Sequence, residues 1–352
     1  MVGAAVAYFL ARRNIQVTLV ERSGVACAAS GKSGGFLALD WCDDSPLEAL
    51  ARRSFALHTQ LARELGTDYG YRRVDTFMLA AHERRALGGG HRVPAPAWLD
   101  GAGVVTGALG SVETTAQIHP ARFTSALVDA ARSRGAALRL GVVREVVRRD
   151  GAAHGVRVDG EILEADAVVL ALGPWTGRLA GGLGLPTVRG LKGYSVTLRA
   201  PDVPAHALFV DYRTADGRTL EPEIFPRPDG EVYVCGMADP QPLPDSPEEV
   251  EVSEAACATL ARATGRVAAV LASAPVERRQ ACYRPVTDDG LPLIGRVPGV
   301  TNCYVATGHG PWGMLNAPAT GLALSELIAD GAATAVDLTP FDPSRLPSAR
   351  VR

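Results

Sequence analysis

The sequence predicts a fold that combines α/β and α+β parts. A doubly wound, Rossmann-like parallel sheet forms a discontinuous nucleotide-binding domain, and an antiparallel sheet forms a second domain. Three observations lead to this prediction: an N-terminal apolar helix precedes a strand closed by Glu21, a buried strand ends abruptly at Gly173, and short strands between Pro, Asp and Gly turns fill residues 190–240. The first two patterns are typical of parallel strands, and the third is typical of antiparallel ones.

Composition limits the classes of partner. A chain of 352 residues with 47% hydrophobic residues can bury the cores of two connected domains. The formal net charge of −2 gives no electrostatic reason to expect a nucleic acid or an anionic membrane as partner. No apolar run approaches the roughly 20 residues of a membrane span. The six cysteines contain no CxxC pair, so we expect free thiols in a reducing compartment and a cytoplasmic protein.

The N-terminal segment matches the second half of a dinucleotide-binding βαβ unit. Gly3 fits the third glycine of the unit, which permits close packing of helix and strand, and Glu21 fits the acid that binds a ribose. The unit's first strand and first two glycines are missing from the sequence. We therefore expect the natural start about a dozen or more residues upstream, and an intact mass of the native protein above that of Met1–Arg352.

The missing strand would be central in the parallel sheet, so its absence has an expected cost. Neighbouring strands would have unpaired edges, and several buried apolar side chains would be lost at about 1.5–3 kcal/mol each. We expect the chain without this strand to fold poorly or to bind its nucleotide weakly.

The remaining elements follow in order. Apolar spacing predicts a helix over 46–65, and residues 66–118 have the pattern of mixed short strands and loops. A helix opens at His119-Pro120, where proline occupies the first turn. The later expected elements are strands over 138–143, 167–172, 194–198, 207–212, 223–226 and 231–235, a helix near 248–271, a strand over 303–306, a helix over 316–328, and a tail after Asp337 without further elements.

Two glycine-rich stretches are candidate ligand loops. Residues 28–35 and 308–313 consist largely of small residues, which let backbone N–H groups approach an anionic ligand. The alternatives are a flexible surface loop for the first and a plain turn for the second. The second stretch matches G-x-G-x-x-G literally, but no strand ending in an acid follows its helix, so it does not open a dinucleotide-binding unit.

In their order along the chain, these motifs resemble the FAD-dependent D-amino acid oxidase superfamily, which includes glycine oxidase and sarcosine oxidase. The resemblance is carried by Gly3-Ala4-Ala5 with Glu21-Arg22, Ser30 to Gly35, Ala171 to Trp175, Arg284 to Pro292, and Thr307 to Gly310 with Ala317 to Gly321. It spans nearly the whole chain and is more specific for the superfamily than for a substrate.

The resemblance implies FAD as the cofactor, bound non-covalently. Glu21 would bind the adenosine ribose, Val143 would hold the adenine through its backbone, and the loop 308–314 would approach the pyrimidine edge of the flavin. The implied cofactor-binding residues are Gly3, Glu21, Arg22, Ser30, Gly31, Lys32, Ser33, Gly34, Gly35, Val143, Gly173, Trp175, Gly308, Gly310, Gly313 and Met314. Cys282 falls where sarcosine-oxidase relatives carry a flavin-linked cysteine, so a covalent link is a secondary option, and a buried free thiol is the default.

Three residues are candidates for catalysis. Arg284 resembles the arginine that grips the substrate carboxylate in glycine oxidase, since a guanidinium binds carboxylate bidentately. Its structural alternative is a salt bridge with Asp288 or Asp289. His309 could polarise the substrate or tune the flavin, or its ring could be satisfied by the backbone. Tyr194 could line the substrate pocket or be a half-buried strand residue.

The domain boundaries follow from these patterns. Residues 1–65, 119–188 and 281–337 are expected to form the FAD-binding domain, and residues 66–118 and 189–280 the substrate-binding domain. Residues 338–352 are expected to form a tail.

The expected function is oxidation of the carbon–nitrogen bond of a small amino acid or N-methyl amino acid by hydride transfer to flavin N5, giving an imine. Oxygen or another electron acceptor would complete the reaction, no metal cluster or Ser-His-Asp set is expected, and the oligomeric state is open. A degenerate, non-catalytic binding module is the main alternative. A nicotinamide-dependent reductase is disfavoured because the two glycine loops have no role in it, and a two-nucleotide disulfide reductase because CxxC is missing.

Overall fold

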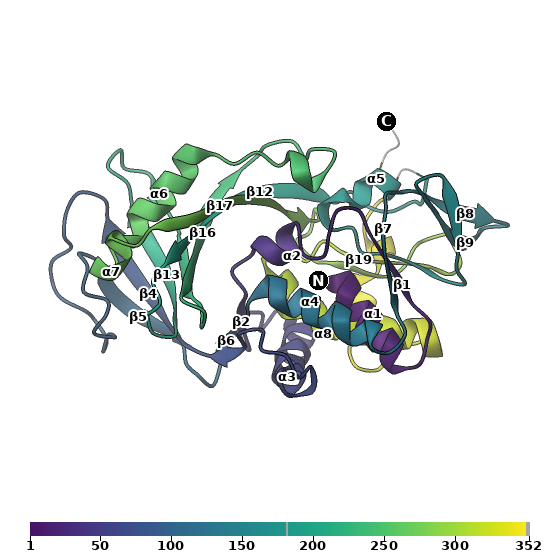
Figure 1. Ribbon diagram of the computed structural model, residues 1–352, viewed down its shortest axis with the longest axis horizontal. Helices are drawn as coiled ribbons and strands as arrows, with labels where there is room; N and C mark the ends of the chain where they lie inside the picture. Colours follow the sequence, from purple (N-terminus) through teal and green to yellow (C-terminus); the bar gives the residue numbers. More distant parts are fainter. Residues whose placement is uncertain (181, 350–352) are drawn as a thin grey trace.

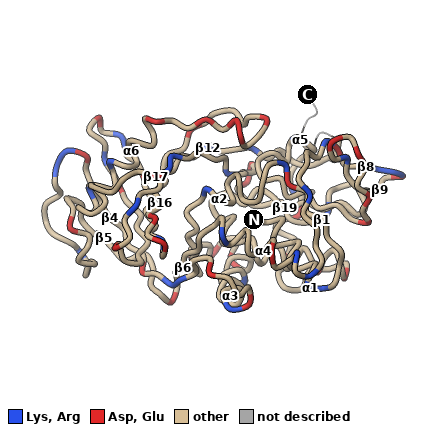
Figure 2. Tube along the Cα trace, viewed as in Figure 1, with Lys and Arg blue, Asp and Glu red and all other residues tan. Residues whose placement is uncertain are grey.

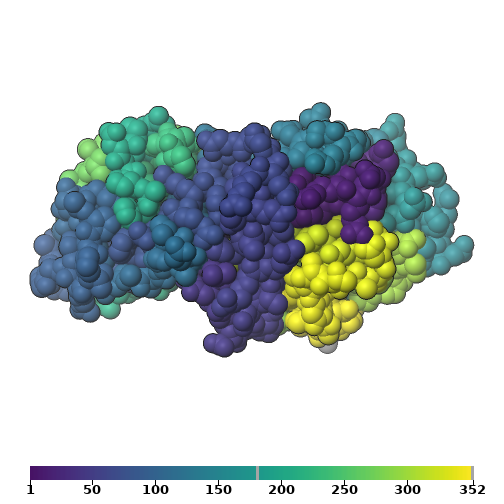
Figure 3. All heavy atoms as spheres, turned by 90° about the horizontal axis from the view of Figure 1, so that it is seen from below, coloured from purple at the N-terminus to yellow at the C-terminus, as the bar shows by residue number. Residues whose placement is uncertain are grey.

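The computed structural model describes residues 1–180 and 182–349. Parallel strands and long helices form one end of the elongated molecule, and a large, mostly antiparallel sheet forms the other (Figure 1). In the space-filling view, a dark-blue band crosses the middle of one face between these two ends (Figure 3). The fold class expected from the sequence is confirmed.

The parallel strands form two separate groups. Strand β1 (Thr18–Glu21) pairs in parallel with β7 (Ala137–Leu140). Strand β11 (Val168–Leu170) pairs in parallel with β19 (Cys303–Thr307), which pairs antiparallel with β18 (Leu293–Arg296). Within residues 1–180 and 182–349, β1 has β7 as its only strand partner and β11 has only β19, so one edge of each strand is free of ladder hydrogen bonds.

Four helices pack into one core beside these strands: α1 (Val2–Arg12), α3 (Glu48–Glu64), α4 (Pro120–Arg132) and α8 (Gly313–Asp330). Helices α1 and α8 approach very closely at Gly321, where a Cβ atom would lie 2.6 Å from the backbone carbon of Ala5. Glycine is therefore required at this crossing, as any side chain would separate the two helices.

Helix α8 contains a proline, and α3 compensates for it. Pro318 has no N–H to donate to the carbonyl of Met314 one turn earlier. The buried His58 ring of α3 instead donates from Nε2 to Met314 O (3.0 Å) and Leu315 O (3.1 Å). Ser54 Oγ, one turn before His58, accepts from Ala319 N at 3.0 Å. These contacts satisfy the backbone groups that proline leaves unpaired.

The other end is a mostly antiparallel, eight-stranded sheet in the order β17-β12-β16-β15-β13-β4-β5, with β14 beside β13, and its β13 and β4 strands pair in parallel. Its strands are β4 (Asp75–His82), β5 (Val104–Gly110), β12 (Arg189–Arg199), β13 (His206–Arg213), β14 (Thr219–Leu220), β15 (Glu223–Pro226), β16 (Glu231–Asp239) and β17 (Val276–Val286). Helices α6 (Glu254–Thr264) and α7 (Ala269–Ala272) cover one face, where the second core lies (Figure 1). The other face is turned toward the helical end.

Smaller elements connect these parts. They are α2 (Ala29–Lys32), the sheet β2 (Phe36–Ala38), β6 (Thr115–Gln117) and β3 (Arg72–Arg73), the meander β8 (Val143–Arg149), β9 (Ala152–Val158) and β10 (Glu161–Glu164), the short helices η1 (Gly173–Thr176), α5 (Gly177–Ala180), η2 (Pro247–Glu249) and η3 (Gly310–Trp312), and the turns η4 (Thr339–Phe341) and η5 (Pro343–Arg345).

Several boundaries differ from the sequence predictions. The strand expected over 138–143 ends at Leu140, and Val143 starts β8 in another sheet. The helix expected near 248–271 is divided into η2, α6 and α7. The tail carries two turns, because Phe341 is buried in the helical core. The domain boundary expected at residue 281 lies inside β17, whose whole length pairs with β12.

In the view of the backbone trace, positions of Lys and Arg lie interspersed with positions of Asp and Glu (Figure 2). Over residues 1–180 and 182–349, none of the helices combines the length and apolarity that crossing a membrane requires.

Candidate active site

Three glycines, called the cradle below, lie after the ends of the paired strands β11 and β19. Gly173 follows β11, and Gly308 and Gly310 follow β19; their φ angles are +57°, +78° and +55°. The Gly173 carbonyl accepts hydrogen bonds from Thr176 Oγ1 (2.7 Å) and Thr307 Oγ1 (2.9 Å), which ties the two strand ends together. A Cβ atom on Gly173 or Gly310 would meet no atom within 4 Å, so both glycines face open space.

The loop 28–35 lies between the helical core and the large sheet. Contrary to the loop expected there, residues 29–32 form the helical turn α2. Tyr233 Oη donates to Lys32 O (2.8 Å), and Arg227 Nη2 donates to Ser33 O (3.0 Å). At Gly34 a Cβ atom would lie 2.5 Å from the Phe225 ring, so only glycine fits. The large sheet therefore fixes the position of this loop.

Two buried polar side chains near the cradle have no partner. Ser33 Oγ and both amide atoms of Asn316, in the first turn of α8, form no hydrogen bond within the described part of the chain. Buried polar groups normally have partners, so a ligand with donors and acceptors fits this region. The open glycines and these polar atoms are compatible with a bound FAD.

The expected nucleotide-binding residues at the N-terminal side lie close to this region. Gly3 allows α1 to approach the end of β11, since its Cβ atom would lie 3.2 Å from that of Ala171. The Met1 amino group donates to Ser30 Oγ at 2.8 Å. Glu21 ends β1 and accepts from Ser23 N at 3.3 Å, while Arg22 turns away to Asp245 O.

The remaining predicted cofactor residues occupy strand and turn positions. Val143 pairs with Val158 in the meander, and Trp175 Nε1 in η1 donates to Pro244 O at 2.9 Å. Gly35 has a φ of +84° next to Ile118. Gly313 and Met314 begin α8 directly after the cradle glycines.

Arg284 lies on β17, on the sheet face opposite α6. Ala281 belongs to the core under α6, and side chains alternate along a strand, so Arg284, three residues later, points to the other face. Its guanidinium extends over Gly193 of β12, where Nη2 would be 3.8 Å from a Cβ atom. Within residues 1–180 and 182–349, it forms no ion pair within 4.0 Å.

The salt-bridge alternative for Arg284 is wrong. Asp288 pairs with Arg189, and Asp289 pairs with Arg345, whose Nε lies 2.8 Å from Asp289 Oδ2. Both acids are therefore engaged elsewhere. The Arg284 guanidinium is left available for an anionic ligand.

Tyr194 lies on the opposite face from Arg284. It pairs with Ala281 across the β12–β17 ladder and belongs to the core under α6, and its hydroxyl donates to Asp239 Oδ2 at 2.9 Å. The structure thus places Tyr194 outside the site described here. These contacts agree with the alternative prediction, in which Tyr194 is a half-buried residue of a strand.

His309 lies between the cradle glycines Gly308 and Gly310 and is buried. Its Nε2 contacts Thr320 Oγ1 of α8 at 3.0 Å, so a side chain rather than the backbone satisfies the ring. Burial lowers the pKa of His309 to about 4. The ring is therefore neutral at physiological pH.

An acid that was not predicted as a site residue lies on the same sheet face as Arg284. Glu223 opens β15 directly opposite Cys235 of β16, and Cys235 Sγ donates to Glu223 Oε2 at 3.5 Å. Burial raises the pKa of the Glu223 carboxyl, while Cys235 and Arg284 lower it. The only available signal was the alternation of the strand, which places Glu223 and Phe225 on one face.

An aromatic wall stands beside Glu223. The rings of Phe36, Trp41, Phe209 and Phe225 contact one another at centroid distances of 4.9–5.8 Å, and Trp312 of η3 packs against Trp41. These rings come from both ends of the molecule. They provide an apolar boundary between the sheet face and the cradle, as small-molecule sites commonly have.

Cys282 lies on β17 next to these groups. Burial raises the pKa of its thiol, while the charges of Lys32 and Arg284 lower it. A raised pKa reduces the thiolate fraction, which favours the free-thiol default.

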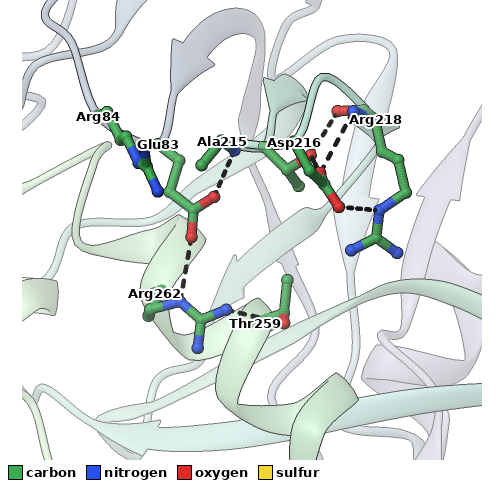
Figure 4. A pocket seen from close by; sticks show the side chains of 8 residues that line it. Glu83, Arg84, Ala215, Asp216, Arg218, Thr259 and Arg262 are labelled. Carbon is green, nitrogen blue, oxygen red and sulfur yellow. Dashed lines mark hydrogen bonds and ion pairs between the residues drawn. The ribbon is translucent and has the colours of Figure 1, made fainter.

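A hollow lined by residues of the large sheet and of α6 holds two acids that are hydrogen-bonded within it (Figure 4). Glu83 accepts from Ala215 N (2.6 Å) and Arg262 Nε (3.3 Å), and Asp216 accepts from Arg218 Nε (2.8 Å). Each acid thus has its own donor. Over the described ranges, no group of three or more His, Cys, Asp or Glu side chains is placed to hold a metal ion.

Comparison with known proteins adds a family match. Residues 1–327 match the sequence model of a family described as FAD dependent oxidoreductase (DAO). The chain is 32% identical to the "Putative oxidoreductase" of Schizosaccharomyces pombe, a match that covers 97% of this chain and 95% of that protein.

Glycine oxidase of Geobacillus kaustophilus is similar in both sequence and structure. Its sequence is 29% identical over 98% of this chain and 94% of its own length. Its crystal structure superposes with a TM-score of 0.79 and 25% identity, and covers 98% of this chain and 96% of that chain.

Proposed function

Because the chain belongs to the DAO family of FAD-dependent oxidoreductases and is an enzyme, we propose that it oxidises the carbon–nitrogen bond of a small amino acid or N-methyl amino acid. The product is an imine, which water hydrolyses. The main support for the proposal is the position of Arg284. Its guanidinium has no ion-pair partner in the described chain and lies on the sheet face that is turned toward the cradle.

We assign the cofactor site to the cradle and its neighbouring loops. Glu21 would bind the ribose, the backbone of residues 30–35 would hold the pyrophosphate, and Gly308 to Met314 would hold the flavin edge. Ser33 Oγ and the Asn316 amide, which lack other partners in the described residues, supply further hydrogen bonds. Bound FAD supplies the two-electron oxidant that accepts a hydride from the carbon next to nitrogen.

The protein's own residues orient the substrate. Arg284 binds the carboxylate with two parallel hydrogen bonds, which fixes the position of the adjacent carbon. The aromatic wall of Phe36, Trp41, Phe209 and Phe225 restricts water and the size of the side chain. His309, neutral through burial, does not add charge to the flavin edge.

The first test is the absorption spectrum of the purified protein. We expect flavin bands at a stoichiometry near one per chain, and bleaching of these bands when small amino acids are added without oxygen. Folded, flavin-containing protein that no amino acid or N-methyl amino acid reduces would contradict the proposed substrate class. Folded protein without flavin would instead support the degenerate binding module. Flavin released entirely by acid precipitation would exclude a link through Cys282.

Replacing Arg284 with lysine should lower kcat/KM for the best amino acid by about 30-fold or more. Lysine keeps the charge but loses the bidentate geometry, and truncating one partner of a buried charged contact costs about 2–5 kcal/mol. Arg279→Lys is the matched control, since Arg279 lies on the same strand and pairs with Glu254 at the surface. Equal kcat/KM in both variants would show that Arg284 does not bind substrate.

A further inference from the structure

Glu223 is a half-buried carboxylate whose role nothing in the fold explains. It lies on β15, next to the aromatic wall, and Phe209 is its strand neighbour on β13. The thiol of Cys235 is its hydrogen-bond donor at 3.5 Å, and within the described ranges no Lys, Arg or His lies within 4.0 Å to form an ion pair. A buried carboxylate is costly without a stronger donor.

Glu223 on β15 and Arg284 on β17 lie on the same face of the large sheet, with two strands between them, and carry opposite charges. Both lie on the sheet face opposite α6, and the charge of Arg284 influences both Glu223 and Cys235. The two groups do not pair with each other within the described chain. A site that presents a cation and an anion without joining them is complementary to a zwitterion.

We propose that Glu223 accepts the ammonium group of a zwitterionic amino acid whose carboxylate lies on Arg284, and removes one proton from it before oxidation. This inference rests on the proposed function and narrows its substrate class. It requires a primary or secondary amine with a free N–H. N-acylated amino acids, quaternary amines and plain carboxylic acids are therefore excluded as substrates.

The proton transfer balances without a co-reactant. The substrate ammonium loses one proton and becomes a neutral amine, and the Glu223 carboxylate becomes a carboxylic acid. No electrons move in this step. The neutral amine can then lose the hydride from its carbon, because its lone pair stabilises the developing positive charge. After product release, Glu223 returns its proton to water.

The groups that face Glu223 set its acidity. Cys235 on β16 and Arg284 on β17 favour the ionised form, whereas burial and the nearby Glu221 favour the protonated form. Asp211 of β13 lies two residues beyond its strand neighbour Phe209 and has one buried oxygen without a partner in the described chain. The net effect is a raised pKa, which suits an acceptor for an ammonium proton.

The test compares Glu223→Gln with Glu221→Gln in the FAD-loaded enzyme. Glu221 is exposed and two residues away, so its variant controls for a change of charge. The panel of glycine, sarcosine, alanine and proline is mixed with each enzyme without oxygen, and the rate constant of flavin reduction and the apparent Kd are measured from pH 6 to 10. Acetate, a carboxylate without an amine, is titrated by its effect on the flavin absorption.

For Glu223→Gln we expect the apparent Kd of the best amino acid to rise about 10-fold or more near pH 7, which corresponds to about 1.4 kcal/mol. Its reduction rate should then rise with pH toward the pKa of the free amine, while acetate binds as in the wild type or more tightly. Glu221→Gln should keep the wild-type affinities near pH 7, and its pH profile should shift only slightly toward lower pH, because the Glu221 charge raises the pKa of Glu223. Glu223→Asp, which retains the carboxylate, should keep the wild-type pH profile and lose part of the affinity.

Wild-type Kd and pH profile in both Glu223 variants would overturn the inference. A wild-type enzyme that holds FAD but is not reduced by any member of the panel would instead contradict the proposed function. If Glu223→Gln does not retain FAD, the inference is tested with Glu223→Asp alone. A wild-type apparent Kd for the amino acid in Glu223→Asp would also overturn the inference.

Discussion

Replacing Glu231 with glutamine is expected to lower the free energy of unfolding by about 3–5 kcal/mol. The Glu231 and Arg227 side chains are each 4% exposed and form an ion pair, and Arg278 adds a second contact to Glu231 from the surface. The variant leaves the Arg227 guanidinium buried without its carboxylate. Such an uncompensated charge costs far more than the loss of a surface ion pair.

The measurement is urea unfolding at pH 7.5. Glu161→Gln removes an acid from the exposed pair with Arg139 and should change the free energy by less than about 1 kcal/mol. The double variant Arg227→Met/Glu231→Leu removes both charges and should recover most of the stability, since it leaves no isolated charge. A Glu231→Gln variant as stable as Glu161→Gln would contradict the prediction.

Glu231→Gln should also make the backbone of the loop 28–35 more mobile. Arg227 donates to Ser33 O and lies over the Tyr233 ring at 5.0 Å, and Tyr233 holds Lys32 O. When Arg227 loses its anchor, these contacts weaken. Hydrogen exchange at Ser33 to Gly35 should therefore accelerate in Glu231→Gln, whereas in Glu161→Gln it should remain unchanged.

Local patterns allowed much of the fold to be predicted. Glu21 at the end of a short strand, Gly173 after a buried strand and Pro120 at the start of a helix each signal an element through neighbouring residues. All three signals act over a few residues of chain. The glycine loops could be predicted for the same reason, because Gly308 and Gly310 adopt positive φ angles within one turn.

The pairing of distant residues could not be predicted. Arg284 does not pair with Asp288 or Asp289, because these acids form ion pairs with Arg189 and Arg345, which are remote from them in sequence. Tyr194 lies behind the sheet because the β12–β17 register places it opposite Ala281. Glu223 could not be recognised as a site residue from the sequence, because only the strand order of the large sheet places it on the same face as Arg284. Register and strand order depend on the whole sheet, and a single sequence does not specify them.

Acidification should destabilise the protein between about pH 6.5 and pH 4. Burial lowers the pKa of His58, His119 and His309 to about 4 each, whereas in the unfolded chain histidine titrates near pH 6.5. In this window the unfolded state therefore binds more protons, and the free energy of unfolding falls as the pH falls. Each of the two fully buried histidines contributes up to about 1.4 kcal/mol per pH unit and about 3 kcal/mol over the whole window, and the partly exposed His119 contributes less.

His58→Gln tests this dependence directly. The glutamine amide can still donate to the carbonyls that Pro318 leaves unpaired, but it does not take up a proton. We expect a modest loss of about 1–2 kcal/mol at pH 7.5 and a smaller slope of the free energy against pH between 6.5 and 4.5, lower by the contribution of one histidine. His154→Gln, at an exposed position, is the control and should keep the wild-type slope.

An unchanged slope in His58→Gln would mean that His58 accepts a proton in the folded state. Because one ring nitrogen of His58 already donates to Met314 O and Leu315 O, the added proton would have to lie on the buried Nδ1, which has no partner in the described chain.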